Sequence, residues 1–128
     1  MTEPAPPDKL KRRAAHARGL AAEARAAALL TALGFAVLAQ RVRTPAGEID
    51  LIVRRDDLLV FCEVKLRADL AGAAFSLQPR QRRRIAAAAE AFLAAHPELC
   101  HLDMRFDVVL LARTGAAEHL AGAFELET

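Results

Sequence analysis

GEIDLIVRRDDLLVFCEVKL, at residues 47–66, carries the clearest secondary-structure pattern in this chain. Two apolar runs, at 48–54 and 58–66, flank the acidic pair Asp56-Asp57, which predicts two strands joined by a tight turn. Consecutive strands joined by so short a loop pair antiparallel. We therefore predict a β-hairpin in the fold.

The register of this hairpin brings charged side chains together. With a two-residue loop, Asp50 lies directly opposite Glu63, and Glu48 lies opposite Lys65. Because successive side chains of a strand point to opposite faces, all four share one face. The other face is expected to be core and carries Ile49, Leu51, Val53, Cys62, Val64 and Leu66. A shift of the register by one residue would separate the two carboxylates.

The remaining sequence predicts one α/β domain with a mixed central sheet of four or five strands flanked by helices, in the order α-β-β-β-α-β. The expected helices span 8–33, closed by Gly34, and a segment from Ser76 or Pro79 to about residue 96. Besides the hairpin, the expected strands span 35–40, 104–113 and, at an edge, 119–126. We predict a loop at residues 67–75. The proline-rich composition of residues 1–7 predicts a disordered tail, which precedes a single domain at 8–128.

The first helix has an apolar stripe and one carboxylate beside it. On the helical wheel, Ala26, Leu29, Leu30 and Leu33 form the stripe that should face the sheet. Glu23 falls at the border of this stripe. We therefore expect one carboxylate of the helix to lie near the core.

Composition limits the classes of function. The 128 residues suit one core, and an aromatic content of 5% argues against a large aromatic ligand cage. The two cysteines form no metal-binding spacing, and we expect both to be free thiols. Residues 1–18 are charged and no apolar run reaches the length of a membrane helix, so we expect a cytoplasmic protein without a membrane partner.

Basic residues are unevenly distributed although the net charge is only +2. One cluster comprises Lys9, Lys11, Arg12, Arg13 and Arg18, and a second comprises Arg80, Arg82, Arg83 and Arg84. Either cluster could contact the phosphates of a nucleic acid, or both could be ordinary solvated faces. On the wheel of the second helix, Gln81 faces inward and the arginines at 80, 83 and 84 point away.

The opposed carboxylates of Asp50 and Glu63 point to metal chemistry. Like charges at this separation destabilise a sheet unless a proton or a cation lies between them. Mg²⁺ or Mn²⁺, which prefer hard oxygen ligands, are the expected cations. Lys65, the only lysine after the first helix, could position an attacking water and stabilise charge on phosphorus, or could simply pair with Glu48.

Gln81 and Asp107 are further candidates. Gln81, at the start of the second helix, could reach a metal-bound water or a phosphate, or could satisfy nearby backbone groups. Asp107 could belong to the site or could be a structural partner of an arginine. The four histidines do not cluster at ligand spacing and receive no role.

Three motifs in this order, GEIDLI at 47–52, FCEVKLR at 61–67 and RFDVV at 105–109, resemble the YraN family of uncharacterised bacterial proteins. With Gly19 and Glu23, the resemblance spans roughly residues 18–125. That family is itself similar to the PD-(D/E)XK nuclease superfamily, which has the restriction-endonuclease-like fold and includes archaeal Holliday junction resolvases. The resemblance implies a restriction-endonuclease-like core for this chain.

The resemblance also implies site residues. Asp50 matches the motif aspartate, Glu63 and Lys65 match the E-x-K pair, and Glu23 resembles the glutamate in the first helix of the resolvases. The implied metal ligands are Asp50, Glu63 and the Val64 carbonyl, with Glu23 binding directly or through water. Where many YraN-like sequences carry a lysine near the start of the second helix, this chain has Gln81.

Our leading hypothesis is a Mg²⁺- or Mn²⁺-dependent nuclease that acts on DNA rather than RNA, with branched or structured DNA as a candidate substrate. Asp50, Glu63, Lys65, Glu23 and Gln81 form its expected catalytic set, and Arg67, Arg80, Arg83 and Arg84 its expected phosphate contacts. A homodimer would suit action on two strands. One alternative is a nucleic-acid-binding module of a DNA-processing assembly, without catalysis. Another is a purely structural polar network.

Overall fold

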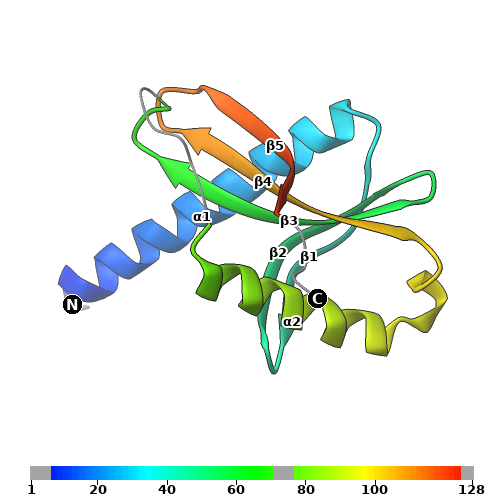
Figure 1. Ribbon diagram of the computed structural model, residues 1–128. Helices are drawn as coiled ribbons and strands as arrows, with labels where there is room; N and C mark the ends of the chain where they lie inside the picture. The colour runs from blue at the N-terminus through cyan, green and yellow to red at the C-terminus, as the bar shows by residue number, and fades with distance from the viewer. Residues whose placement is uncertain (1–6, 71–76, 125–128) are drawn as a thin grey trace.

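The computed structural model describes residues 7–70 and 77–124, which form one five-stranded sheet between two helices. The elements are α1 (Pro7–Ala32), β1 (Ala36–Thr44), β2 (Gly47–Arg55), β3 (Leu58–Arg67), α2 (Pro79–Ala95), the 3₁₀ helix η1 (Pro97–Leu99), β4 (Asp103–Ala112) and β5 (Ala117–Phe124). The strands lie in the order β1-β2-β3-β4-β5, and β3 and β4 are parallel whereas the other neighbours are antiparallel. The predicted α/β class with a mixed, helix-flanked sheet is confirmed and is consistent with a restriction-endonuclease-like core (Figure 1).

The predicted hairpin register is confirmed, although the ladder is short. Partners run from Arg55 and Leu58 beside the turn to Leu51 and Cys62, and Asp56 adopts a left-handed φ of 53° in the turn. Beyond Leu51, β2 stays paired with β1 as far as Gly47, whereas β3 stays paired with β4. Figure 1 shows β1 and β2 bending toward α2 while β3 continues away from them. The two strands therefore separate at Asp50 and Glu63.

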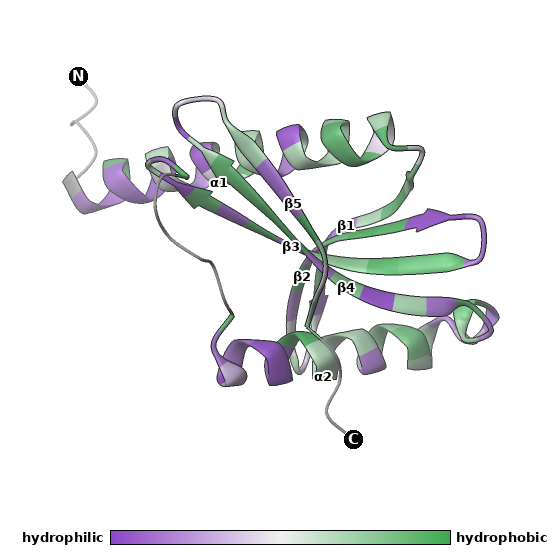
Figure 2. Cartoon of the chain, turned by 45° about the horizontal axis from the view of Figure 1, so that its top comes forward, coloured by the Kyte–Doolittle hydropathy of each residue, from purple (hydrophilic) through white to green (hydrophobic). Residues whose placement is uncertain are grey.

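Both faces of the sheet are buried, not one. The α1 side of the sheet packs Ala22, Ala26 and Leu30 against the apolar residues Leu51, Val53, Val60, Cys62, Val109 and Leu111. The α2 side packs Ile85, Ala88, Ala89 and Phe92 against Ile49, Ile52, Phe61, Phe106 and Val108. In Figure 2, apolar segments of the central strands lie between the helices, and the first half of α1 and the start of α2 are hydrophilic. This layering explains the continuous apolar runs in the strands.

Two predicted packing positions are wrong. Ile49 was expected beside Leu51 and Val53, but it packs on the α2 side because β2 leaves β3 at Asp50 and turns its next side chain to the other core. Leu33 was expected in the apolar stripe of α1, but it is exposed, since the helix ends at Ala32 and Gly34 turns the chain with a φ of 93°.

Several predicted boundaries also shift. The first strand runs from Ala36 to Thr44 rather than over 35–40, because the arginine-rich continuation pairs with β2. The predicted helix start at Ser76 and the end of the predicted strand at 119–126 lie outside the described residues, as do residues 1–6 of the predicted tail. None of the described helices is long and apolar enough to cross a membrane.

Candidate functional site

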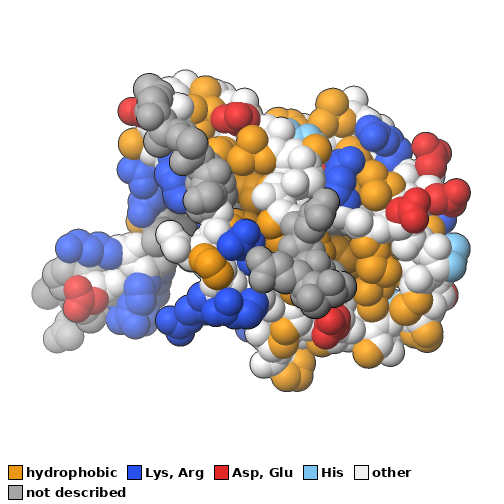
Figure 3. All heavy atoms as spheres, viewed as in Figure 1, with side chains coloured by type: hydrophobic (Ala, Val, Ile, Leu, Met, Phe, Trp, Pro, Cys, Tyr) orange, Lys and Arg blue, Asp and Glu red, His pale blue; other side chains and the backbone are white. Residues whose placement is uncertain are grey.

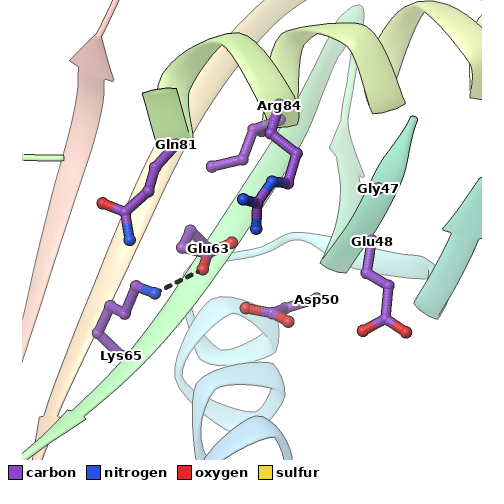
Figure 4. A pocket seen from close by; sticks show the side chains of 8 residues that line it. Gly47, Glu48, Asp50, Glu63, Lys65, Gln81 and Arg84 are labelled. Atoms are coloured by element: carbon purple, nitrogen blue, oxygen red, sulfur yellow. Dashed lines mark ion pairs between the residues drawn. The ribbon is translucent and has the colours of Figure 1, made fainter. Parts of the chain in front are cut away.

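A pocket of about 360 Å³ opens where β2 leaves β3, under the first turns of α2. Its lining comprises Gly47, Glu48 and Asp50 from β2, Glu63 and Lys65 from β3, and Gln81, Arg84 and Ile85 from α2. Figure 4 shows Asp50, Glu63, Lys65 and Arg84, from the three elements, pointing toward this space, whereas the Glu48 carboxylate points away from it. The structure therefore brings together Asp50, Glu63, Lys65 and Gln81, as predicted from the sequence.

Asp50 has an unusual environment in this pocket. Its Oδ2 accepts a hydrogen bond of 2.8 Å from the backbone N–H of Val64. Burial and the adjacent Glu63 carboxylate raise the pKa of Asp50 to about 7, against the opposing effect of the Val64 hydrogen bond. Two carboxylates therefore face each other in a partly buried space, where a proton or a cation is favoured between them.

Lys65 forms an ion pair within the pocket, 3.0 Å from Nζ to Oε1 of Glu63 (Figure 4). The alternative pairing of Lys65 with Glu48 is wrong, since Glu48 is largely exposed and pairs with Arg43 at 3.1 Å. Both Lys65 and Glu63 side chains are partly buried. A single ammonium is thus held beside the two opposed carboxylates.

Glu23 lies near the pocket without lining it. Its Oε2 accepts a hydrogen bond of 2.6 Å from Nε of Arg41. The Glu23 carboxylate is nevertheless close enough to contribute to the raised pKa of Asp50, after burial and Glu63. In the described part of the chain, no three His, Cys, Asp or Glu side chains form a group that could hold a metal ion.

The start of α2 contributes differently from the prediction. Arg84 was expected to point away, but it lines the pocket. The pocket lies beside the apolar face of α2 that packs on the sheet, and not beneath that face. Gln81 lines the pocket as expected, and its Oε1 also accepts a hydrogen bond of 3.1 Å from the N–H of Gln78, as the structural alternative required. Arg80 and Arg83 are exposed and do not line the pocket, and Arg67 is exposed at the end of β3.

Sequence reasoning missed Gly47 and Arg41. Gly47 adopts a φ of 151°, and a Cβ there would lie 2.7 Å from Cγ of Arg84, so glycine allows the arginine to pass close to β2. The turn at 44–47 was a usable signal for Gly47. The contact of Arg41 with Glu23 has no local signal, because it joins β1 to α1.

Asp107 lies outside the pocket and confirms the structural alternative. It is fully buried in β4, and its carboxylate accepts two hydrogen bonds of 2.8 Å from Arg105. His119 Nε2 lies 2.7 Å from the same carboxylate, and the N–H of Gly122 donates to it at 2.9 Å. The group therefore ties β4 to β5.

The donor set at the pocket fits a hard divalent cation. Mg²⁺ and Mn²⁺ commonly take one or two carboxylates and complete their coordination with water and substrate phosphate oxygens. Asp50 and Glu63 offer two carboxylates whose mutual repulsion a cation would relieve. The fit therefore rests on two carboxylates and needs no third.

Comparison with known proteins agrees with the motif resemblance. The model of uncharacterised protein family UPF0102 matches residues 22–111, which include every residue that lines the pocket. A UPF0102 protein of Azorhizobium caulinodans is 70% identical over 130 residues that cover 99% of each chain. A UPF0102 protein of Bradyrhizobium sp. strain BTAi1 is 50% identical over 127 residues, covering 99% of this chain and 91% of the relative. This chain therefore belongs to the uncharacterised protein family UPF0102.

Proposed function

We propose that this protein is a metal-dependent phosphodiesterase that acts on nucleic acid, with DNA as the preferred substrate. The observation that carries the proposal is the opposition of Asp50 and Glu63 in a partly buried pocket, with the raised pKa of Asp50 and the ammonium of Lys65 beside them. Two carboxylates that share a pocket, one of them with a strongly raised pKa, are typical of functional sites.

Each residue of the pocket has a role in this proposal. Asp50, Glu63 and the Val64 carbonyl would hold Mg²⁺ or Mn²⁺, which supplies Lewis-acid stabilisation of a phosphoryl group when bound. Lys65 positions the attacking water and stabilises the negative charge that develops on the phosphoryl oxygens. Gln81 keeps the start of α2 in place through Gln78 and orients a phosphate or water with its amide nitrogen.

Substrate binding depends on the arginines around the pocket. Arg84 reaches into it and would contact the phosphate nearest the carboxylates. Arg80 and Arg83, exposed on the same helix, and Arg67, at the end of β3, would contact phosphates further along the strand. Figure 3 shows Lys and Arg side chains gathered on one face over the starts of α1 and α2.

The first test is thermal melting of the wild type and Asp50→Asn with and without millimolar Mn²⁺. A ligand that binds only the folded state raises the melting temperature, so Mn²⁺ should stabilise the wild type and not the variant. The asparagine can still accept the Val64 hydrogen bond, which separates metal binding from folding. Equal responses of the two proteins would remove the metal site from the proposal.

The second test is cleavage of duplex and branched DNA in the presence of Mn²⁺. Lys65→Ala should lower the rate about 100-fold or more, because one group that stabilises developing charge typically contributes that much. Arg54→Ala, at the far end of β2, removes a positive charge outside the pocket and should leave the rate unchanged. Undiminished cleavage by Lys65→Ala would contradict the role given to this residue.

A nucleic-acid-binding module without catalysis is the second candidate. It is favoured by the exposed basic residues of the first half of α1 and by Arg80 and Arg83 of α2, which lie outside the pocket lining. This function predicts salt-dependent DNA binding that survives a chelator and Asp50→Asn, with no cleavage under any metal. Binding that disappears with the metal would count against it.

A further inference from the structure

Arg41 has a backbone conformation that its residue type rarely adopts. It lies within the edge strand β1 and has a φ of 53°, in the left-handed region. The β1–β2 ladder resumes on either side of it, with Gln40 opposite Leu51 and Val42 opposite Ile49. Such a conformation of a non-glycine residue costs free energy and persists only where surrounding contacts require it.

The contact that accompanies this conformation reaches from β1 to α1. Nε of Arg41 donates to Oε2 of Glu23 over 2.6 Å, and the Glu23 side chain is only 14% exposed. The Arg41 side chain is 38% exposed, so solvent and ligands can approach the guanidinium. The left-handed backbone conformation of Arg41 therefore accompanies the contact of its guanidinium with the Glu23 carboxylate of α1.

The same arrangement lies beside the metal ligands named above. The flanking pairs of the ladder put Arg41 level with Asp50 in the sheet. Burial and Glu63 dominate the raised pKa of Asp50, and the charge of Glu23 adds to it, so Glu23 is within electrostatic reach. Yet Glu23 does not line the pocket, and no group of three carboxylates is formed among the described residues.

We propose that Arg41 is a positioning residue that holds Glu23 out of the metal site, so that only Asp50 and Glu63 offer carboxylates to the ion. This inference rests on the metal site of the proposed function. Breaking the Arg41–Glu23 pair would make Glu23 available as a third carboxylate, directly or through water, and would tighten the binding of a divalent cation. Arg41 thus limits the metal affinity of the protein.

The test is a Mn²⁺ titration by isothermal calorimetry of four proteins: wild type, Arg41→Gly, Glu23→Gln and the double variant. Glycine adopts a φ of 53° without strain, so Arg41→Gly removes the guanidinium and keeps the strand. We expect Arg41→Gly to bind Mn²⁺ at least about fivefold more tightly than the wild type, the lower range of typical coupling between sites. In the Glu23→Gln background, the same change should leave the affinity unchanged.

The Glu23→Gln background separates the proposal from simple charge effects. An equal gain in both backgrounds would mean that Arg41 acts only through net charge, and a loss of affinity in Arg41→Gly would mean that it presents Glu23 to the ion; either result overturns the proposal. Should Arg41→Gly fail to fold, Arg41→Asn removes the same group with a residue that tolerates this conformation. Failure of the proposed function is distinct, because then Asp50→Asn would bind Mn²⁺ as the wild type does.

Discussion

Asp50 makes the stability of the protein depend on pH. Its pKa rises from about 4 in an unfolded chain to about 7, mainly through burial and then through Glu63, so between these values the folded state binds more protons than the unfolded state. The unfolding free energy contributed by this group is therefore fully present below pH 4 and is lost as the pH rises to about 7.

This dependence can be measured by urea unfolding of the wild type and Asp50→Asn at pH 5 and pH 8. The wild type should lose stability relative to the variant on going to pH 8, because only the wild type must ionise a buried carboxyl. Millimolar Mn²⁺ at pH 8 should restore part of the loss in the wild type alone. Parallel stability profiles without metal would show that Asp50 ionises normally in the folded protein.

Loss of Asp107 should destabilise the fold without touching the pocket. Burial alone would raise the pKa of Asp107. Hydrogen bonds with Arg105, Gly122 and His119 outweigh this effect and lower the pKa. Asp107→Ala should cost about 1.5–3 kcal/mol of unfolding free energy or more, because it removes the buried carboxylate that Arg105, His119 and Gly122 contact. His119→Gln, which removes one contact and keeps the carboxylate, should cost less by urea unfolding. Equal costs would contradict this account of the network.

At the scale of elements, the approach of α2 to β2 depends on Gly47. Gly47→Ala should displace the stem of Arg84, since a Cβ would lie 2.7 Å from its Cγ. Gly115→Ala is the matched control, because Gly115 also has a positive φ, 102°, but has no atom within 4 Å of the added Cβ. Both variants should lose about 1–3 kcal/mol of stability through backbone strain.

Only Gly47→Ala should weaken DNA binding. Loss of one hydrogen bond between Arg84 and a phosphate is worth about 1.5–3 kcal/mol, or about a tenfold weaker Kd or more. Fluorescence anisotropy with a labelled duplex measures this difference at one salt concentration. A tenfold loss in both variants would assign the effect to stability, and no loss in either would remove Arg84 from the DNA contacts.

The hairpin shows what local patterns can predict. A two-residue loop determined the register as far as Leu51 and Cys62, and Asp50 and Glu63, the next residues along the two strands, both line the pocket. The pattern could not predict where the ladder ends, because the Asp50 carboxylate takes the N–H of Val64 and α2 packs on the end of β2. Ile49 was therefore assigned to the wrong face.

Residues that reach the site across elements were also beyond local patterns. A helical wheel predicts the direction of the Arg84 side chain from its angular distance to the apolar face of α2. The pocket lies at the edge of that face, so Arg84 can still line it. The side chain of Arg41 was missed because its partner, Glu23, is 18 positions earlier in the chain, and the apolar stripe of α1 does not specify which strand residue Glu23 meets. Motif residues were predictable, and the residues that position them were not.

At the scale of the whole molecule, the first half of α1 extends the basic surface beyond the pocket. Between residues 8 and 18 there are five lysine and arginine residues and one aspartate, and all of these charged side chains are exposed. Eleven helical residues span about 16 Å, a length over which duplex DNA carries about ten phosphate charges. Figure 3 shows Lys and Arg side chains over the starts of α1 and α2 on the same face.

We expect this half of α1 to bind duplex DNA by releasing counterions. Replacing Lys9, Lys11, Arg12 and Arg13 by glutamine should flatten the plot of log affinity against log salt by about 0.9 for each phosphate that the variant no longer neutralises. Arg54→Gln, at the opposite end of the sheet, should leave the slope unchanged, and anisotropy titrations at several salt concentrations measure both. Asp50→Asn should keep the wild-type slope, because the pocket carboxylates neutralise no phosphate. An unchanged slope in the quadruple variant would confine the DNA contacts to α2 and the pocket. The basic side chains of α1 would then serve solubility or bind another partner.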